Sequence, residues 1–440
     1  MKTDAEYPRT LIIGESFDRF TGGGITLRNL FSGWPLDRIA VAAARQDFTD
    51  WDSCSRYYRL GRNETKGVWP IYRSSRALPS GPVQPINSLK IEDLPPAVST
   101  NEKHRSVFRR MASASMSRLG VSELLTDSCV SPEFLEWVRA FFPEVIYSQL
   151  GSISAIRFVK QLVFETQLPL VVHVMDDWAK YLYTGLATEC YLRRILDKEF
   201  RDLLHYTTRR LGICQDMCDA YQVRYGGDWL PFHNPVELSV SQSYARKEWK
   251  SGSPFRILYG GRIGRGIWNS LLAIGCAVSE LVRSGADIVF EIRTPDQKFS
   301  VAHKLKALVG VKVMPPLSYD KVSANLASAD LLVIPYDFDE YSATSSRLSM
   351  PTKTAEYMSS GTPILIYAPN DFAITQYALA QQWGMIVDQP GILSIKSAIL
   401  ALMNDEKMRE RFGSQAKLVA ENNHSGESIR ELFRQALTII

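Results

Sequence analysis

DLLVIPYDFDEYSATSSRLSMPTKTAEYMSSGTPILIYAP, residues 330–369, contains two apolar runs separated by a polar stretch with helical spacing. The runs DLLVIPY (330–336) and TPILIYAP (362–369) have the length of buried strands and are apolar at nearly every position. Such runs are typical of parallel strands that are covered on both faces. The order of strand, helix and strand therefore predicts a βαβ unit in a parallel sheet.

The same alternation of apolar runs and helical patterns extends through most of the chain. It is interrupted by a polar stretch at 236–254 and restarts at FRILYGG (255–261). We therefore expect an α/β protein with two doubly wound parallel-sheet domains, 1–236 and 237–425, followed by a closing helix at 426–440. In detail, the pattern predicts a flexible turn at TGGGI (21–25), a helix over 193–210 and a strand over 211–215.

The composition argues against several classes of protein. The 440 residues are 45% hydrophobic and 22% charged, as in ordinary folded domains. A formal net charge of +4 over this length is too small to indicate a nucleic-acid-binding protein. Because there is no apolar run of about eighteen residues and no signal-peptide core near the start, we expect a cytoplasmic protein without a transmembrane helix.

The six cysteines do not form a metal-binding pattern. Cys214 and Cys218 are four residues apart in a predicted helix, but no histidine or further cysteine accompanies them at metal-ligand spacing. We expect reduced thiols and no metal site.

Polar residues and glycines gather next to the predicted strands, which is where ligands bind in doubly wound sheets. The candidate site residues are Gly22, Gly23 and Gly24 after the first strand, His173 and Asp177 around LVVHV (170–174), Arg262 and Arg265 after FRILYGG, and Lys353 and Glu356 before TPILIYAP.

Each of these groups also has an ordinary alternative. The glycines at 22–24 either let the backbone approach an anion closely, with amides at the start of a helix, or form a plain turn, and their order is not the G-x-G-x-x-G of dinucleotide sites. Arg262 and Arg265 either bind phosphate or lie solvated. His173 is either a site residue or a core histidine. Asp177 is a general base, a partner for an acceptor hydroxyl or a helix cap.

Two further features are equally open at this level. Lys353 and Glu356 are three residues apart and share a helix face, so they form either an exposed ion pair worth a few tenths of a kcal/mol or a pair of groups aimed at one ligand. The basic stretch 103–118 is either a peripheral contact with anionic lipid or a solvated helix face.

The second half of the chain resembles the retaining GT-B glycosyltransferases of the large family 4. ILYGGRIGRG (257–266) is similar to the strand–Gly–Arg loop that meets the donor diphosphate. PTKTAEYMSSGTPIL (351–365) is similar to the P-x-K-x-x-E-Y…G-x-P motif of bacterial polysaccharide members. The first half resembles the family in its glycine-rich loop, its histidine-bearing strand end and its exit into the linker: GGGITLRNLF (22–31), VVHVMDDW (171–178) and WLPFHNPVE (229–237).

The resemblance implies a GT-B fold, in which two Rossmann-like domains face each other across a cleft. It implies transfer of a sugar from a UDP-, GDP- or dTDP-sugar to a glycan or lipid-linked acceptor in bacterial surface-polysaccharide synthesis. The nucleotide sugar is a co-substrate, and neither a separate cofactor nor a divalent metal is expected.

The resemblance also implies roles for the candidate residues. Glu356 would hold the donor ribose hydroxyls, while Lys353 and Arg262 would neutralise the diphosphate as it leaves, with Arg265 as the nearest further cation. The glycines at 22–24 would approach the phosphates or the sugar, and His173 would lie beside the sugar.

One departure from the family pattern leaves the donor sugar open. Members often carry a second glutamate eight residues before the one that matches Glu356, and here that position is Leu348, which cannot form a hydrogen bond through its side chain. Asp339, Glu340 or a backbone group of 341–350 could substitute for it. Two other functions remain open on the same fold: a nucleotide-sugar 2-epimerase that needs no acceptor, and a non-catalytic glycan-binding protein.

Overall fold

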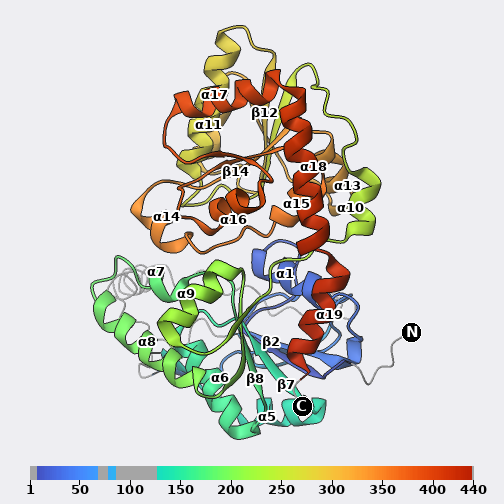
Figure 1. The fold of residues 1–440 in the computed structure, drawn as a ribbon. Helices are drawn as coiled ribbons and strands as arrows, with labels where there is room; N and C mark the ends of the chain where they lie inside the picture. Colours follow the sequence, from blue (N-terminus) through green and yellow to red (C-terminus); the bar gives the residue numbers. More distant parts are fainter. Residues whose placement is uncertain (1–6, 68–77, 86–125, 439–440) are drawn as a thin grey trace, which may run out of the picture. The chain divides into compact units, whose positions relative to one another are not determined.

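The computed structural model describes residues 7–67, 78–85 and 126–438 (Figure 1). The chain divides into two compact units. The first contains Met1–Gly212, Tyr221–Leu230 and Leu432–Ile440, and the second contains Ile213–Ala220 and Pro231–Glu431.

The first unit is built on an eight-stranded sheet that is parallel from β9 to β3 and antiparallel between β3 and β5. In spatial order its strands are β10 (Trp229–Pro231), β9 (Thr207–Gly212), β8 (Leu170–Val174), β7 (Val145–Ser148), β1 (Thr10–Ile13), β2 (Ile39–Ala43), β3 (Tyr57–Arg59) and β5 (Gly81–Val83). Every residue of β1, β2, β7 and β8 is buried, as the apolar runs predict. A separate antiparallel pair joins β4 (Thr65–Gly67) to β6 (Thr126–Ser128).

Helices connect the strands of this unit. They are α1 (Gly22–Leu30), the 3₁₀ helix η2 (Leu36–Arg38), α5 (Pro132–Phe141), α6 (Ile153–Thr166), α7 (Trp178–Tyr181), α8 (Glu189–Leu204) and, from Tyr221 on, α9 (Gln215–Tyr225). The last helix of the chain, α19 (Gly426–Leu437), contributes Phe433, whose ring packs edge-on against the rings of Phe31 and Tyr147.

The predicted helix over 193–210 is wrong at its C-terminal end. Helix α8 stops at Leu204, and residues 207–212 form β9, which pairs in parallel with β8. The β-branched pair Thr207 and Thr208 favours an extended chain, and the hydrogen bonds of the sheet outweigh the helical spacing of the sequence. The predicted strand at 211–215 is correspondingly displaced, because β9 ends at Gly212.

The second unit is built on a six-stranded sheet in which all the strand pairs are parallel. In spatial order the strands are β13 (Val311–Met314), β12 (Ile288–Arg293), β11 (Phe255–Gly260), β14 (Leu331–Pro335), β15 (Ile364–Tyr367) and β16 (Met385–Val387). Its helices are α10 (Leu238–Tyr244), α11 (Trp268–Arg283), α12 (Ser300–Lys306), α13 (Tyr319–Ala327), α14 (Glu340–Ser345), α15 (Thr354–Ser359), α16 (Ala373–Gln381), α17 (Ile392–Asn404) and α18 (Glu406–Asn423).

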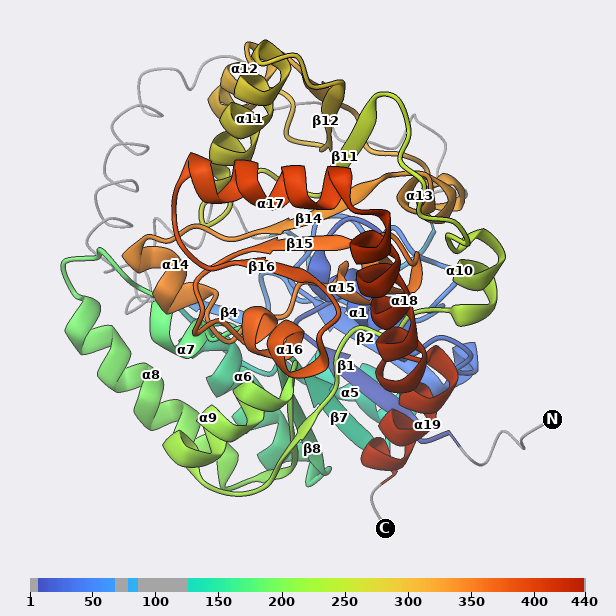
Figure 2. The ribbon, with the colours of Figure 1, turned by 45° about the horizontal axis from the view of Figure 1, so that its top comes forward.

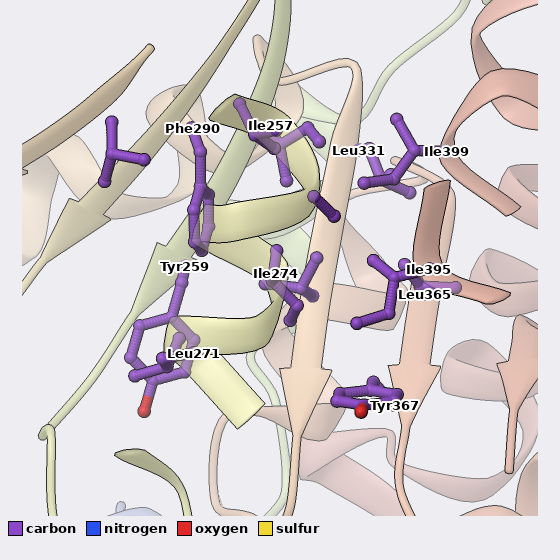
Figure 3. Close-up of a cluster of buried hydrophobic side chains, with 14 of the residues drawn as sticks. Ile257, Tyr259, Leu271, Ile274, Phe290, Leu331, Leu365, Tyr367, Ile395 and Ile399 are labelled. Carbon is purple, nitrogen blue, oxygen red and sulfur yellow. The ribbon is translucent and has the colours of Figure 1, made fainter. Parts of the chain in front are cut away.

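Helices α11 and α17 cover the same face of this second sheet (Figure 2). Leu271 and Ile274 from α11 meet Ile395 and Ile399 from α17 over the side chains of β11, β12, β14 and β15 in one apolar cluster (Figure 3). This close packing keeps the strands in place. The loops at the carboxyl ends of β11 and β14, where ligands bind in such sheets, therefore begin from fixed positions.

Candidate functional site

Lys353 is the N-cap residue of α15 (Thr354–Ser359), and its side chain turns back towards the end of β11. The Nζ atom donates a hydrogen bond of 3.0 Å to the carbonyl of Gly260. It also lies 3.9 Å from the ring centroid of Tyr259 and 5.9 Å from that of Tyr357. The ammonium group is therefore held by one carbonyl and two aromatic rings, which is a cation–π arrangement.

Gly261 makes this position of Lys353 possible. Its φ of +155° lies in a region that residues with a side chain rarely adopt. A Cβ atom built on Gly261 would lie 2.5 Å from Nζ of Lys353. The glycine thus provides both the backbone turn and the space for the ammonium group.

Arg262 and Arg265 follow on a loop that several hydrogen bonds keep in place. The hydroxyl of Tyr259 donates to the carbonyl of Arg262 at 2.7 Å, and the amide of Ile263 donates to Asp296 Oδ2 at 2.9 Å. Both arginine side chains are exposed, and the guanidinium of Arg265 lies 3.8 Å over the ring of Tyr341. Within the described part of the chain, neither arginine has an ion pair closer than 4.0 Å, so their charges are available to an anion.

Glu356 lies one helical turn beyond Lys353, and both side chains are partly buried. Burial raises the pKa of the Glu356 carboxyl to about 7, and it lowers the pKa of the Lys353 ammonium to about 7. The charge of each group opposes the shift in the other. Over the described residues, no ion pair closer than 4.0 Å involves Glu356.

The two groups are therefore more than an exposed ion pair on a helix surface. An exposed pair would keep ordinary pKa values, whereas here burial opposes the charge on both groups. Perturbed titrating groups at the end of a parallel strand indicate a ligand site. The prediction that Lys353 and Glu356 share a helical turn is confirmed, and Gly361 follows the helix with a positive φ of 70°, as a terminating glycine does.

Leu348, at the position of the absent glutamate, is buried at 5% exposure. Its carbonyl accepts a hydrogen bond from the thiol of Cys214 at 3.4 Å. Of the residues that could replace it, Asp339 caps α14 by accepting from the amide and hydroxyl of Ser342. Asp339 is thus engaged with its own helix, while Glu340 is exposed at the first position of that helix.

In the first unit, the three glycines do not form a flexible turn as predicted. They are the first three residues of α1, whose N-cap Thr21 accepts a hydrogen bond from the amide of Gly24 at 3.0 Å. A Cβ on Gly24 would lie 2.5 Å from Cγ of Asp18, so the glycine makes room for a carboxylate. The amides at a helix start need acceptors; Thr21 accepts from the amide of Gly24, and Asp18 accepts from the amides of Phe20 and Thr21 just before the helix.

Asp18 and Arg45 were not among the predicted site residues. Asp18 accepts hydrogen bonds from the amides of Phe20 and Thr21 and forms an ion pair of 2.7 Å with Arg45. Burial would raise the pKa of Asp18, but these bonds leave it below its usual value. An aspartate three residues before an N-cap threonine is the local signal that could have indicated this loop.

His173, Tyr147 and Gln149 form a hydrogen-bonded chain at the end of the first sheet, and Gln149 lies close to Gly23. His173 is fully buried in β8, and its Nδ1 lies 2.7 Å from the hydroxyl of Tyr147. That hydroxyl also accepts a bond of 3.4 Å from Nε2 of Gln149, whose Oε1 would lie 3.1 Å from a Cβ on Gly23. The structure therefore connects two of the predicted regions through Tyr147 and Gln149.

Asp177 takes part in a buried ion pair. Its carboxylate accepts two hydrogen bonds from Arg224, of 2.7 and 3.0 Å, and a third from the hydroxyl of Tyr221 at 3.0 Å. Asp177 is 2% exposed and joins the start of α7 to α9. These contacts are those of a residue that supports the fold of the first unit.

Replacing Tyr221 by phenylalanine tests this supporting role. The substitution removes one bond to a buried carboxylate, and we expect the free energy of unfolding to fall by about 1.5–3 kcal/mol. Denaturant unfolding would measure the loss. Tyr244→Phe is the control because this tyrosine is exposed, and equal stability of both variants would contradict the role.

The remaining predictions concern charge, metal and membrane. The basic stretch 103–118 lies outside the described residues. Among the residues that the structure describes, no group of three or more histidine, cysteine, aspartate or glutamate side chains is placed to hold a metal ion. No helix in the described ranges is long and apolar enough to cross a membrane.

Comparisons with known structures define the class of fold. The chain is similar to sucrose-phosphate synthase from Thermosynechococcus elongatus, with a TM-score of 0.60 and 12% identity over 97% of this chain and 98% of that one. It is equally similar to Anabaena HepE in complex with UDP and glucose, with a TM-score of 0.60 and 12% identity over 99% and 100% of the two chains. WaaG, a glycosyltransferase involved in lipopolysaccharide biosynthesis, gives a TM-score of 0.55 and 12% identity over 98% and 99%. The chain thus has the GT-B fold with Rossmann-like domains, and that expectation is confirmed.

A comparison with protein-family models adds information on the activity of the second unit. Residues 282–419 match the family model described as Glycosyl transferases group 1. The match includes Lys353 and Glu356, and it supports glycosyltransferase activity. No curated protein matches the sequence.

Proposed function

We propose that this protein is a retaining glycosyltransferase that moves a sugar from a nucleotide sugar to a glycan or lipid-linked acceptor. The proposed setting is bacterial surface-polysaccharide synthesis in the cytoplasm. The observation that carries the proposal is the arrangement of Lys353, Arg262 and Glu356 at the end of β11. Lys353 and Glu356 lie within the group 1 match, and Arg262 belongs to the same unit.

The proposed chemistry follows from the charges at this site. In the transfer, the bond between the anomeric carbon and the donor diphosphate breaks, a bond to the acceptor oxygen forms on the same face of the sugar, and the proton of the acceptor hydroxyl passes to the departing diphosphate. The electron pair of the broken bond stays on the diphosphate, whose added charge needs stabilisation. Arg262 and Lys353 have no competing carboxylate within 4.0 Å in the described chain, so they can take this charge without a metal ion.

The other residues have supporting roles in this proposal. Glu356 accepts hydrogen bonds from the donor ribose hydroxyls, and Arg265 adds positive charge near the phosphates. The glycines at 22–24, which belong to the first unit, contact the acceptor, and the buried His173 supports this end of the sheet through the Tyr147 hydroxyl rather than by contact. Asp177 holds the first unit together through Arg224.

A donor screen tests the proposal directly. Thermal shift is measured with UDP-, GDP-, dTDP- and CMP-sugars, each with and without EDTA. A stabilisation by one nucleotide family that survives EDTA supports a metal-independent transferase, since a ligand at 100 times its Kd adds about 2.7 kcal/mol. Absence of any shift would contradict the proposal.

Product analysis then separates the alternatives that share this fold. Release of the nucleotide only in the presence of an acceptor supports transfer. An epimerised donor without acceptor would indicate an epimerase, and binding without turnover over a donor and acceptor panel would indicate a binding protein.

Substituting alanine for Gly261 tests the position of Lys353 that this proposal requires. The added Cβ displaces the Lys353 ammonium and strains a φ of +155°. We expect the affinity for the donor nucleotide to fall about tenfold, equivalent to ~1.4 kcal/mol, while the fold persists. Calorimetric titration would measure the affinity. Gly264→Ala in the same loop is the control because a Cβ there meets nothing within 4 Å; equal loss in both variants would contradict the role of Gly261.

A further inference from the structure

Tyr259 makes a different contact with each end of its side chain. The residue is fully buried near the end of β11. Its ring lies 3.9 Å from Nζ of Lys353, and its hydroxyl donates at 2.7 Å to the carbonyl of Arg262. A single side chain therefore supports both residues that we assign to the diphosphate.

Core packing alone does not explain this tyrosine. Its ring belongs to the apolar cluster of the second unit, where a phenylalanine would fill the same space. Figure 3 shows the hydroxyl at the margin of the cluster, directed away from Phe290 and Ile274. A buried hydroxyl lowers stability unless it is hydrogen-bonded, and here its partner is the loop carbonyl of Arg262.

Contacts of Tyr357 and Gly260 also hold the backbone and the ammonium group next to Tyr259. Tyr357 places its hydroxyl 2.8 Å from the amide of Gly260, whose carbonyl accepts from Lys353. Burial raises the pKa of Tyr259 well above 10, so its hydroxyl remains a donor over the working pH range. The loop carbonyl of Arg262 and the ammonium of Lys353 are thus fixed relative to one rigid ring.

We propose that Tyr259 is a positioning residue that couples Arg262 to Lys353, so that both cations engage one diphosphate together. The inference rests on the proposed function and deepens it. Its consequence differs for the two ends of the side chain: loss of the hydroxyl displaces the loop and costs the contribution of Arg262, whereas loss of the ring removes support from the ammonium of Lys353.

Two substitutions separate the two ends of the side chain. Tyr259→Phe keeps the ring and loses the hydroxyl, and we expect about a tenfold rise in the Kd for UDP or GDP with no change in its pH dependence. Tyr259→Leu also loses the ring, and we expect a larger rise, of about 30–100-fold. In that variant the pH above which binding weakens also moves down, because the cation–π contact no longer favours the charged form of Lys353.

A double-mutant cycle distinguishes coupling from general destabilisation. Binding of UDP and of GDP is measured by calorimetry for wild type, Tyr259→Phe, Arg262→Ala and the double variant. Coupling predicts that Tyr259→Phe has little further effect once Arg262 is removed. Tyr367→Phe is the matched control, since this buried tyrosine of the same cluster contacts Gly391 instead.

The outcomes distinguish failure of the proposed function from failure of the positioning role of Tyr259. If wild type binds neither UDP nor GDP and shows no shift with any nucleotide sugar of the donor screen, the proposed function fails and this inference fails with it. If wild type binds, but the Tyr259 variants lose thermal stability with unchanged Kd and pH dependence, the proposed function stands and the positioning role is overturned. Additive losses in the cycle would also overturn it.

Discussion

Replacing Lys353 by methionine is expected to lower the rate of sugar transfer by about 10²–10³-fold, the usual loss when one preorganised group that stabilises transition-state charge is removed. Methionine matches the length and apolar body of lysine but carries no charge for the leaving diphosphate. The measurement is initial velocity with the donor identified by thermal shift. Lys321→Met, on the exposed side of α13, is the control and should retain full activity.

The same variant is expected to be more stable than wild type when no nucleotide is bound. Burial lowers the pKa of Lys353 from 10.5 to about 7, so between these values the unfolded chain binds more protons than the folded one. The contribution of Lys353 to stability therefore rises with pH from about 7 to 10.5, and below pH 7 its burial is most unfavourable.

Methionine removes the unfavourable free energy of burying a charged ammonium group, so the melting temperature at pH 7 should rise. A gain of ~1 kcal/mol corresponds to about 2–4 °C for a domain of this size. Thermal unfolding from pH 6 to 10 would show the flatter profile. A variant that lost both activity and stability would indicate that Lys353 supports the fold rather than a ligand.

Replacing Glu356 by alanine is expected to lower kcat/KM by about 10²–10⁴-fold. A carboxylate that accepts two ribose hydroxyls forms charge-assisted bonds worth about 1.5–3 kcal/mol each, and alanine loses both. Glu410→Ala, exposed on α18, is the control. Activity within twofold of wild type in Glu356→Ala would remove this residue from the site.

The pH profile gives the Glu356 prediction a second measurement. Burial raises the pKa of Glu356 to about 7, so the carboxylate forms as pH rises through that value, while Lys353 loses its proton over the same range. Because the two groups titrate together, wild-type kcat/KM should follow a bell with its maximum near pH 7. Glu356→Gln should lose the acid limb and Lys353→Met the alkaline limb.

For stability, the sign for Glu356 is opposite to that for Lys353. A carboxyl whose pKa is raised in the folded protein binds more protons there than in the unfolded chain between pH 4.5 and about 7. Its contribution to stability therefore falls as pH rises over that interval. Glu356→Gln should remove this fall.

Local sequence was sufficient for the elements that carry the candidate site. FRILYGG, DLLVIPY and TPILIYAP predict strands, and they contain β11, β14 and β15. Burial on both faces requires nearly continuous apolar runs, and their short length and flanking glycines and prolines favour strands over helices. The turn shared by Lys353 and Glu356 was equally predictable, because helical spacing is a property of neighbouring residues.

Periodicity was not sufficient where side-chain capping or strand pairing decides. TGGGI has the composition of a turn, but Thr21 caps a helix that begins at Gly22, and Asp18 accepts from the amides of Phe20 and Thr21 just before it. Residues 207–210 continue the helical spacing of the sequence before them, but they pair in parallel with β8 and form part of a strand. In both cases the deciding hydrogen bonds come from groups that periodicity does not reveal.

By itself, the sequence determined two parallel-sheet units and a lysine and a glutamate on one helical turn between two buried strands. The tertiary structure decided what Lys353 faces: the carbonyl of Gly260, the ring of Tyr259 and the space left by Gly261, about 90 residues earlier in the chain. Pair spacing along a helix is set by local geometry, whereas burial, and with it the pKa of both groups, depends on what the fold packs around them.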